Sequence, residues 1–227
     1  MALTKTRKNS SFGDFFRSLL GGQFRYWHFQ RWEADYPKAD RQFVMGVKRL
    51  TRINARSTEH VVDAGSNVLF DYPWIYFEDA GAWRLSDAQA KRLREYIHRG
   101  GFIMLDDSWG DQEWAVMAEG VDQILPGSPI QAIPANDPIF HTVYDLANLK
   151  QIPGTRYVWG RPWMRPDEVH PRWAVVRDEK GRIVIAICQN SDVGDAWEWA
   201  DSPKYPQPQA TEAYRLGINY IVYAMTH

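Results

Sequence analysis

The sequence has little of what marks several functional classes. Its single cysteine, Cys188, excludes an intrachain disulfide framework and a multi-cysteine zinc site. Lys and Arg total 27 against 28 Asp and Glu, so the formal net charge is −1. This balance gives no general attraction to nucleic acid or to an acidic membrane. The longest unbroken apolar run, Ile183 to Cys188, is too short to span a bilayer. We therefore expect a soluble chain with no nucleic-acid partner and no transmembrane segment.

The N-terminus also lacks a readable export signal. Lys5, Arg7 and Lys8 are not followed by an apolar signal core, because polar residues interrupt it. Apolar residues then recur at helical spacing from Phe12 to Leu20, and two glycines end that pattern. We expect residues 1–22 to form a basic tail with a short amphipathic helix, and residues 23–227 to form a single α/β domain. The compartment stays unknown; the sequence as written suits the cytoplasm.

Aromatic residues are abundant, and 11 of them are tryptophan. An aromatic-rich core is the favoured explanation, and a recognition surface is the alternative. Short apolar segments alternate with amphipathic ones, which predicts a three-layer α/β sandwich around a mostly parallel sheet. The predicted strands are 24–29, 61–62, 67–70, 74–77, 102–105, 130–133, 172–176 and 182–188. The predicted helices are 37–53, one that begins near Ser86, 111–123 and 210–225.

Polar residues follow three of the predicted strands, at 78–79, 106–109 and 189–192. Ligands of such sheets bind beyond the carboxyl ends of the strands, so these segments predict the site. Asp106 and Asp107 are candidates for metal binding or for general acid–base chemistry, because two adjacent acids raise a carboxyl pKa. The alternative is structural: one of them caps a helix or accepts backbone hydrogen bonds. Trp109 would lie beside them.

Three further candidates have a structural alternative of their own. His141 could bind a divalent metal with an aspartate, or carry a proton, although lone histidines are usually structural. Ser191 and Asp192 are better explained as caps of a following helix than as nucleophile and acid, although Asp192 could still line a pocket. Cys188 lacks the glycine-flanked turn of a nucleophile, so we expect an ordinary buried thiol.

A basic residue and several tryptophans would surround the same edge of the sheet. Arg25 would bind a carboxylate or a phosphate, or else pair with Asp106 to hold two strands together. Trp27, Trp109 and Trp197 complete this expected lining. His28, at the end of the first predicted strand, is a second histidine within reach.

Several segments in series resemble one bacterial family, the domain of unknown function 4159 family. They include Asp71–Tyr76, Leu93–Ile97, Gly100–Asp107, Asp137–His141, Asn190–Gly194 and Leu216–Ala224. The resemblance extends from about residue 22 to the C-terminus. It implies a flavodoxin-like, class I glutamine amidotransferase-like fold, and it supplies no activity. It also implies partners among membrane-linked von Willebrand A-type proteins and chaperone-like ATPases, and family members are often exported or membrane-tethered.

These observations together predict a non-catalytic ligand-binding or scaffold module. The ligand would be a small polar molecule or a partner protein, bound by acids and tryptophans at the strand ends. The alternative is a hydrolase that uses Asp106, Asp107, His141 and Asp192. A structural subunit that docks through residues 12–20 is a third reading. No cofactor is predicted, and a divalent metal ion stays an open alternative.

Overall fold

The computed structural model describes residues 35–146, 148–159 and 165–227. The predicted N-terminal helix at 12–20, the predicted strand at 24–29 and the candidate residues Arg25, Trp27 and His28 lie outside the described residues. None of the helices in the described part of the chain is long and apolar enough to cross a membrane.

One five-stranded sheet runs through the molecule in the order β1-β2-β5-β4-β3. Its strands are β1 (Trp74–Phe77), β2 (Phe102–Ser108), β3 (Gln131–Ala132), β4 (Arg172–Arg177) and β5 (Ile183–Gln189). The β1–β2 and β2–β5 pairs are parallel, whereas β4 is antiparallel to both of its neighbours. Only β4 therefore opposes the common strand direction, which confirms the predicted mostly parallel α/β sheet.

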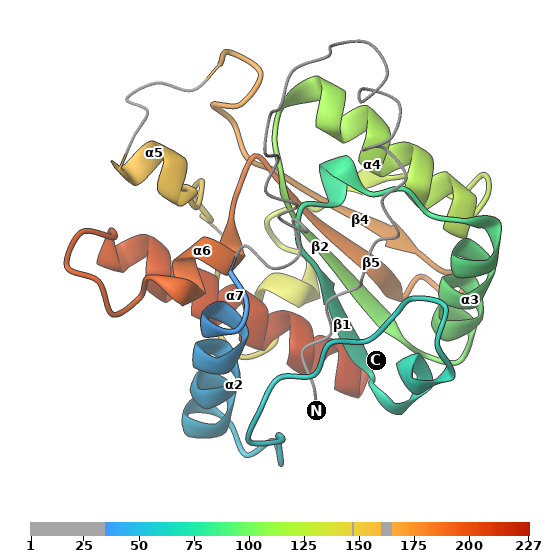
Figure 1. Cartoon of the computed structure of the whole chain (residues 1–227), viewed down its shortest axis with the longest axis horizontal. Helices are drawn as coiled ribbons and strands as arrows, with labels where there is room; N and C mark the ends of the chain where they lie inside the picture. The colour runs from blue at the N-terminus through green and yellow to red at the C-terminus, as the bar shows by residue number, and fades with distance from the viewer. Residues whose placement is uncertain (1–34, 147, 160–164) are drawn as a thin grey trace, which may run out of the picture.

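Helices cover both faces of this sheet (Figure 1). One face packs against α2 (Lys38–Leu50), α6 (Val193–Glu198) and α7 (Gln207–Thr226), and the other against α3 (Asp87–His98) and α4 (Gly110–Ile124). Successive residues of a strand point to opposite faces. Tyr76 and Met104 accordingly enter the first core, and Phe77 and Leu105 enter the second. Both faces of β1, β2 and β5 are buried, which explains the unbroken apolar runs of these strands.

Local signals explain where several elements begin and end. Ser86 caps α3 through a complete capping box with Gln89, as its position predicts. Gly100, at φ +99°, turns the chain into β2. Asp178 accepts hydrogen bonds from the amides of Lys180 and Arg182 and so closes the predicted hairpin between β4 and β5.

Two predicted strands are wrong. Residues 67–70 form the 3-10 helix η2 (Asn67–Asp71), because the Ser66 hydroxyl accepts a hydrogen bond from the amide of Val68 and starts a tight turn. Residues 61–62 have no regular structure. The remaining short elements are η3 (Ala80–Ala82), η4 (Pro138–Phe140) and the one-turn helix α5 (Thr155–Trp159).

Candidate functional site

Three neighbouring parallel strands lead into left-handed backbone at the same edge of the sheet. Asp79 follows β1 with φ 54°, Asp107 lies near the end of β2 with φ 51°, and Asn190 follows β5 with φ 57°. They are the positive-φ residues other than glycine in the described part of the chain. Asp and Asn tolerate this conformation best, yet each still costs about 1 kcal/mol or more. Because strain of this kind gathers at functional sites, this edge is the candidate site.

Asp106 connects β2 to the start of α6. Its Oδ2 accepts hydrogen bonds from the Tyr76 hydroxyl at 2.7 Å and from the amides of Val193 at 2.8 Å and Gly194 at 3.0 Å. Its Oδ1 is buried and has no hydrogen-bond partner among the described residues. Burial raises the pKa of the Asp106 carboxyl to about 7, against the effect of these hydrogen bonds. Asp106 is therefore both an anchor and a group that titrates near neutrality.

Asp107 is the half-buried neighbour of Asp106. The pairing register of β2 shifts between Leu105 and Ser108, and this irregularity accompanies the left-handed backbone at Asp107. Its Oδ1 accepts a hydrogen bond of 2.6 Å from the Trp109 indole Nε1. Burial raises the pKa of the Asp107 carboxyl well above its usual value, and the charges of Asp79 and Glu78 raise it further.

Two more carboxylates come from α6. Asp192 is the N-cap of this helix, as predicted, and its Oδ1 accepts the amide of Asp195 at 2.7 Å. Asp195 Oδ2 accepts both the amide of Thr155, at 2.5 Å, and its hydroxyl, at 2.9 Å. Burial, followed by the charges of Asp195, Asp107 and Asp35, raises the pKa of the Asp192 carboxyl well above its usual value.

We call the four carboxylates of Asp106, Asp107, Asp192 and Asp195 the acidic rim. The charge of Asp106 raises the pKa of Asp107, and the charges of Asp195 and Asp107 raise the pKa of Asp192. No described Lys or Arg forms an ion pair with any of the four. The rim therefore concentrates negative charge that the described residues do not neutralise.

A hard cation has a matching donor set at one end of the rim. Asp35, Asp192 and Asp195 are buried, and one oxygen from each lies within 4.8 Å of the others. Carboxylate oxygens are the ligands that Mg²⁺ and Ca²⁺ prefer. Two of these residues already accept hydrogen bonds from Asp195 and Thr155, which limits the oxygens left for coordination. The three carboxylates are suited to bind a positive group or to share a proton.

The predicted tryptophans take different places. Trp109 is 2% exposed and joins Asp107 to α5, since its indole also lies 4.9 Å from the ring of Tyr157. Trp197 is fully buried and stacks on Phe43 with ring centroids 3.9 Å apart, so it belongs to the core. Ser191 is fully buried as well, and its hydroxyl accepts the amide of Ile152 at 3.3 Å.

His141 does not join the acids. Its Nε2 contacts the carbonyl oxygen of Ala135 at 2.9 Å, and its Nδ1 lies 3.2 Å from Asp145. None of its contacts within the described residues involves the acidic rim. Cys188 is fully buried on β5, and burial together with the charge of Asp106 raises the pKa of its thiol well above the usual value. A thiol held in this way is a poor nucleophile.

Sequence reasoning missed four residues of this site: Asp35, Tyr76, Thr155 and Asp195. The spacing of Asp192 and Asp195 carried a usable signal, because an acid three residues after an N-cap is typical of a helix start. Tyr76 lies inside an apolar strand, and its hydroxyl finds its partner, Asp106, only on the neighbouring strand. Thr155 is 40 residues from Asp195, and no local pattern connects the two.

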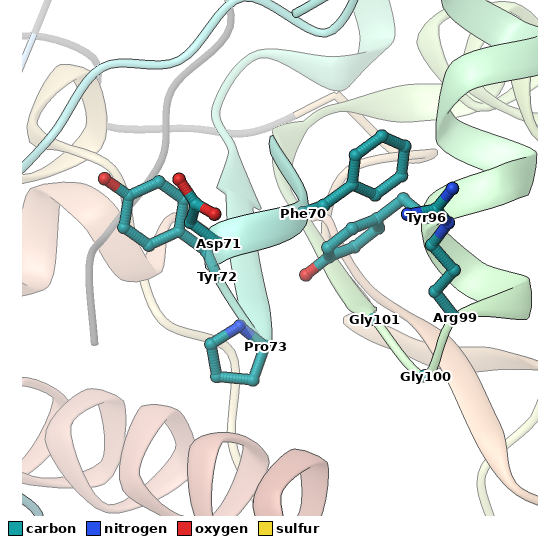
Figure 2. Close-up of a pocket in the computed structure, with 8 residues that line it drawn as sticks. All are labelled: Phe70, Asp71, Tyr72, Pro73, Tyr96, Arg99, Gly100 and Gly101. Carbon is teal, nitrogen blue, oxygen red and sulfur yellow. The ribbon is translucent and has the colours of Figure 1, made fainter. Parts of the chain in front are cut away.

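A cavity of about 280 Å³ lies at the opposite edge, where β1 and β2 begin (Figure 2). Figure 2 shows the Phe70 ring beside the Arg99 side chain, and the guanidinium lies 4.3 Å from the ring centroid. Tyr96 fills the space above Gly101, where an added Cβ would come within 2.3 Å of the ring. These residues already pack against one another. The acidic rim is therefore the stronger candidate for a functional site.

The fold and the rim define an α/β protein with a strained, acidic site at the carboxyl ends of its parallel strands. The family described as "Domain of unknown function (DUF4159)" matches residues 23–225, and the chain belongs to this family. No curated protein matches the chain.

Proposed function

We propose that this chain is a class I glutamine amidotransferase-like domain without the Cys-His-Glu machinery, acting as a non-catalytic module that binds a small, positively charged ligand. The acidic rim would hold the ligand. One observation carries the proposal: four carboxylates meet at strand ends with left-handed backbone, and no described basic side chain pairs with them.

Electrostatics favours a cationic ligand. Buried carboxylates of like charge repel each other and carry raised pKa values, so their ionised forms are held at a cost in free energy. A positive group placed among them would supply a counter-charge that the described residues do not, and it would lower that cost. Because such a ligand binds only the folded chain, it raises the free energy of unfolding.

The positions of Cys188 and His141 support binding over catalysis. A cysteine hydrolase needs a thiolate beside a base, whereas the Cys188 thiol is buried and kept neutral. A metal-free Asp–His hydrolase needs the imidazole within reach of the carboxylates, whereas His141 contacts Ala135 and Asp145. The von Willebrand A-type and ATPase partners, which the family resemblance implies, stay predictions.

The test measures thermal unfolding of the full chain with butylammonium chloride and with MgCl₂, each against NaCl at equal ionic strength. We expect at least one of the two cations to raise the melting temperature of the wild type. Asp107→Asn should remove most of this increase, and Glu179→Gln, an exposed acid in the β4–β5 hairpin, should keep it. Equal responses to both cations and to NaCl in the wild type would contradict the proposal.

A hydrolase is the second candidate, and Asp107 favours it. This carboxyl is half-buried and has a raised pKa, which suits a general acid. The measurement is turnover of a panel of nitrophenyl esters, phosphates and glycosides. Hydrolysis that Asp107→Asn abolishes and Glu179→Gln preserves would establish an enzyme. A panel without turnover would leave the binding module as the better account.

A further inference from the structure

Arg156 lies beside the acidic rim without pairing with it. It follows Thr155, whose amide and hydroxyl donate to Asp195. Its guanidinium lies 4.7 Å from the centroid of the Trp109 ring, and the Nε1 of the same ring donates to Asp107. One indole therefore carries a positive group against its ring and a negative group at its Nε1. Arg156 is tied to the rim on two sides, through α5 and through Trp109.

The ion pair of Arg156 with its acidic neighbour is weak. Its ion pair with Glu168 is long, at 3.9 Å. Glu168 is already satisfied: it accepts the Arg165 amide and Nε at 3.0 Å each and the Tyr157 hydroxyl at 2.6 Å. The rings of Trp109 and Tyr157 lie 4.7 and 4.8 Å from the Arg156 guanidinium and hold it in place. Its side chain is still 41% exposed, which leaves N–H groups available for an anion.

We propose that the ligand is a short zwitterion, with an ammonium group at the acidic rim and a carboxylate group on the Arg156 guanidinium. This inference rests on the proposed function and narrows its ligand. A simple cation is attracted by the acidic rim but repelled by Arg156. A simple anion is attracted by Arg156 but repelled by the rim. A molecule with both charges gains twice, and Arg156 thereby determines specificity. The guanidinium offers the paired donors that match a carboxylate.

The experiment compares ω-amino acids of increasing length with the matching amine and acid. The probes are glycine, β-alanine, 4-aminobutanoate and 5-aminopentanoate, set against butylammonium and butanoate at equal ionic strength. The readout is the melting temperature of the full chain. The variants are Arg156→Gln, Asp107→Asn and, as a matched control, Arg215→Gln, which removes an exposed arginine that stacks on Tyr144 from α7.

We expect one length of amino acid to shift the melting temperature by more than the sum of the amine and acid shifts. Arg156→Gln should reduce that shift to the one seen with the amine, Asp107→Asn should abolish both, and Arg215→Gln should change neither. Equal shifts with the amine and with every amino acid in the wild type would overturn the zwitterion and leave cation binding intact. An excess shift that survives Arg156→Gln would also overturn it. If neither the amine nor Mg²⁺ nor any amino acid shifts the wild type, the proposed function itself fails.

Discussion

Asp106 and Asp107 are adjacent in sequence and perform different tasks. Asp106 is fully buried and accepts two amides at the start of α6, where the positive end of the helix favours a carboxylate. Asp107 has a left-handed backbone, and within the described residues its side chain accepts one hydrogen bond, from the Trp109 indole. The first aspartate is thus required by the fold. The fold does not depend on Asp107 in this way, so its carboxylate can bind a ligand.

Asp107→Asn should stabilise the ligand-free protein at pH 7.5 by about 1 kcal/mol. The amide removes repulsion from Asp79, Glu78 and Asp106 and keeps an oxygen for the Trp109 indole. Asparagine also accepts the left-handed backbone well. The measurement is urea-induced unfolding of both proteins. A large destabilisation would show that Asp107 is structural and would remove the main support for the proposed site.

Asp106→Ala provides the contrasting control. It leaves the amides of Val193 and Gly194 and the hydroxyl of Tyr76 without their buried acceptor. Each unsatisfied buried group costs about 1–3 kcal/mol, so we expect a loss of about 3 kcal/mol or more. The same urea series measures it. A loss below 1 kcal/mol would mean that α6 does not depend on this carboxylate.

Three of the four acids of the acidic rim could be predicted from the sequence, and the groups around them could not. Asp106 and Asp107 directly follow one apolar run, Asp192 lies four residues after the end of another, and parallel strands bring such positions to one edge. Thr155 and Arg156 lie in a region rich in Pro and Gly, where no periodicity fixes the backbone. Their contacts with Asp195 and Trp109 span about 40 residues or more and arise from tertiary packing alone. His141, a prediction from residue type, is held by its own local contacts.

The short helix α6 depends on its surroundings, because six residues do not form a stable helix alone. Asp106 and Asp192 accept the amides of its first turn. Trp197 packs between Phe43 of α2 and Tyr76 of β1. Gly217 of α7 lets these rings approach, since an added Cβ would meet Phe43 at 2.5 Å and Trp197 at 2.8 Å. The position of the rim thus depends on close packing between α2, α6 and α7.

Gly217→Ala should destabilise the protein by about 2 kcal/mol. Alanine favours a helix interior by about 1 kcal/mol over glycine, but here its methyl group overlaps two buried rings. The control is Thr211→Ala on the exposed side of the same helix, which should change stability by less than about 0.5 kcal/mol. Chemical unfolding of the three proteins measures both. A Gly217→Ala variant as stable as the wild type would mean that α7 can move away from α2 and α6.

Elements with a complete local signal were predictable, and those shaped by tertiary packing were less so. The β4–β5 hairpin and the start of α3 follow from Asp178 and Ser86, whose side chains satisfy nearby amides. The segment Asn67–Asp71 contains β-forming apolar residues, yet the Ser66 hydroxyl turns it into η2. β2 continues to Ser108 because Ser108 pairs with Gln189 of β5, which no pattern within β2 reveals.

Across the whole molecule, the near-neutral composition hides an uneven distribution of charge. The formal net charge is −1, yet the acidic rim gathers four carboxylates at and beyond the carboxyl ends of β2 and β5, and no described Lys or Arg forms an ion pair with them. The described basic residues form their ion pairs elsewhere, as Arg182 does with Asp178 in the hairpin and Arg41 with Glu59. A local field of this kind attracts a cation even when the total charge does not.

This uneven distribution predicts an unusual pH profile: the ligand-free protein should lose stability as the pH rises from 5 to 8. The pKa of Asp106 is raised to about 7, and those of Asp107 and Asp192 are also raised, whereas the unfolded chain releases these protons near pH 4. The folded state therefore binds more protons across this window. The stabilisation is complete below pH 4 and is lost as the pH passes through the folded pKa values.

Carboxyls with lowered pKa values, such as Glu168 and Asp178, act in the opposite direction only near pH 4 and below, outside this window. We expect a decrease on the order of 1–3 kcal/mol between pH 5 and 8, measured by urea unfolding at pH 5, 6.5 and 8. Asp107→Asn should flatten the profile, and a ligand that stabilises the wild type should do so most at pH 8, where the rim is ionised. A free energy of unfolding that rises steadily from pH 5 to 8 would contradict this prediction. It would show that the rim carboxylates are ionised in the folded protein and balanced by positive groups of the chain. A cationic ligand would then gain nothing by binding there.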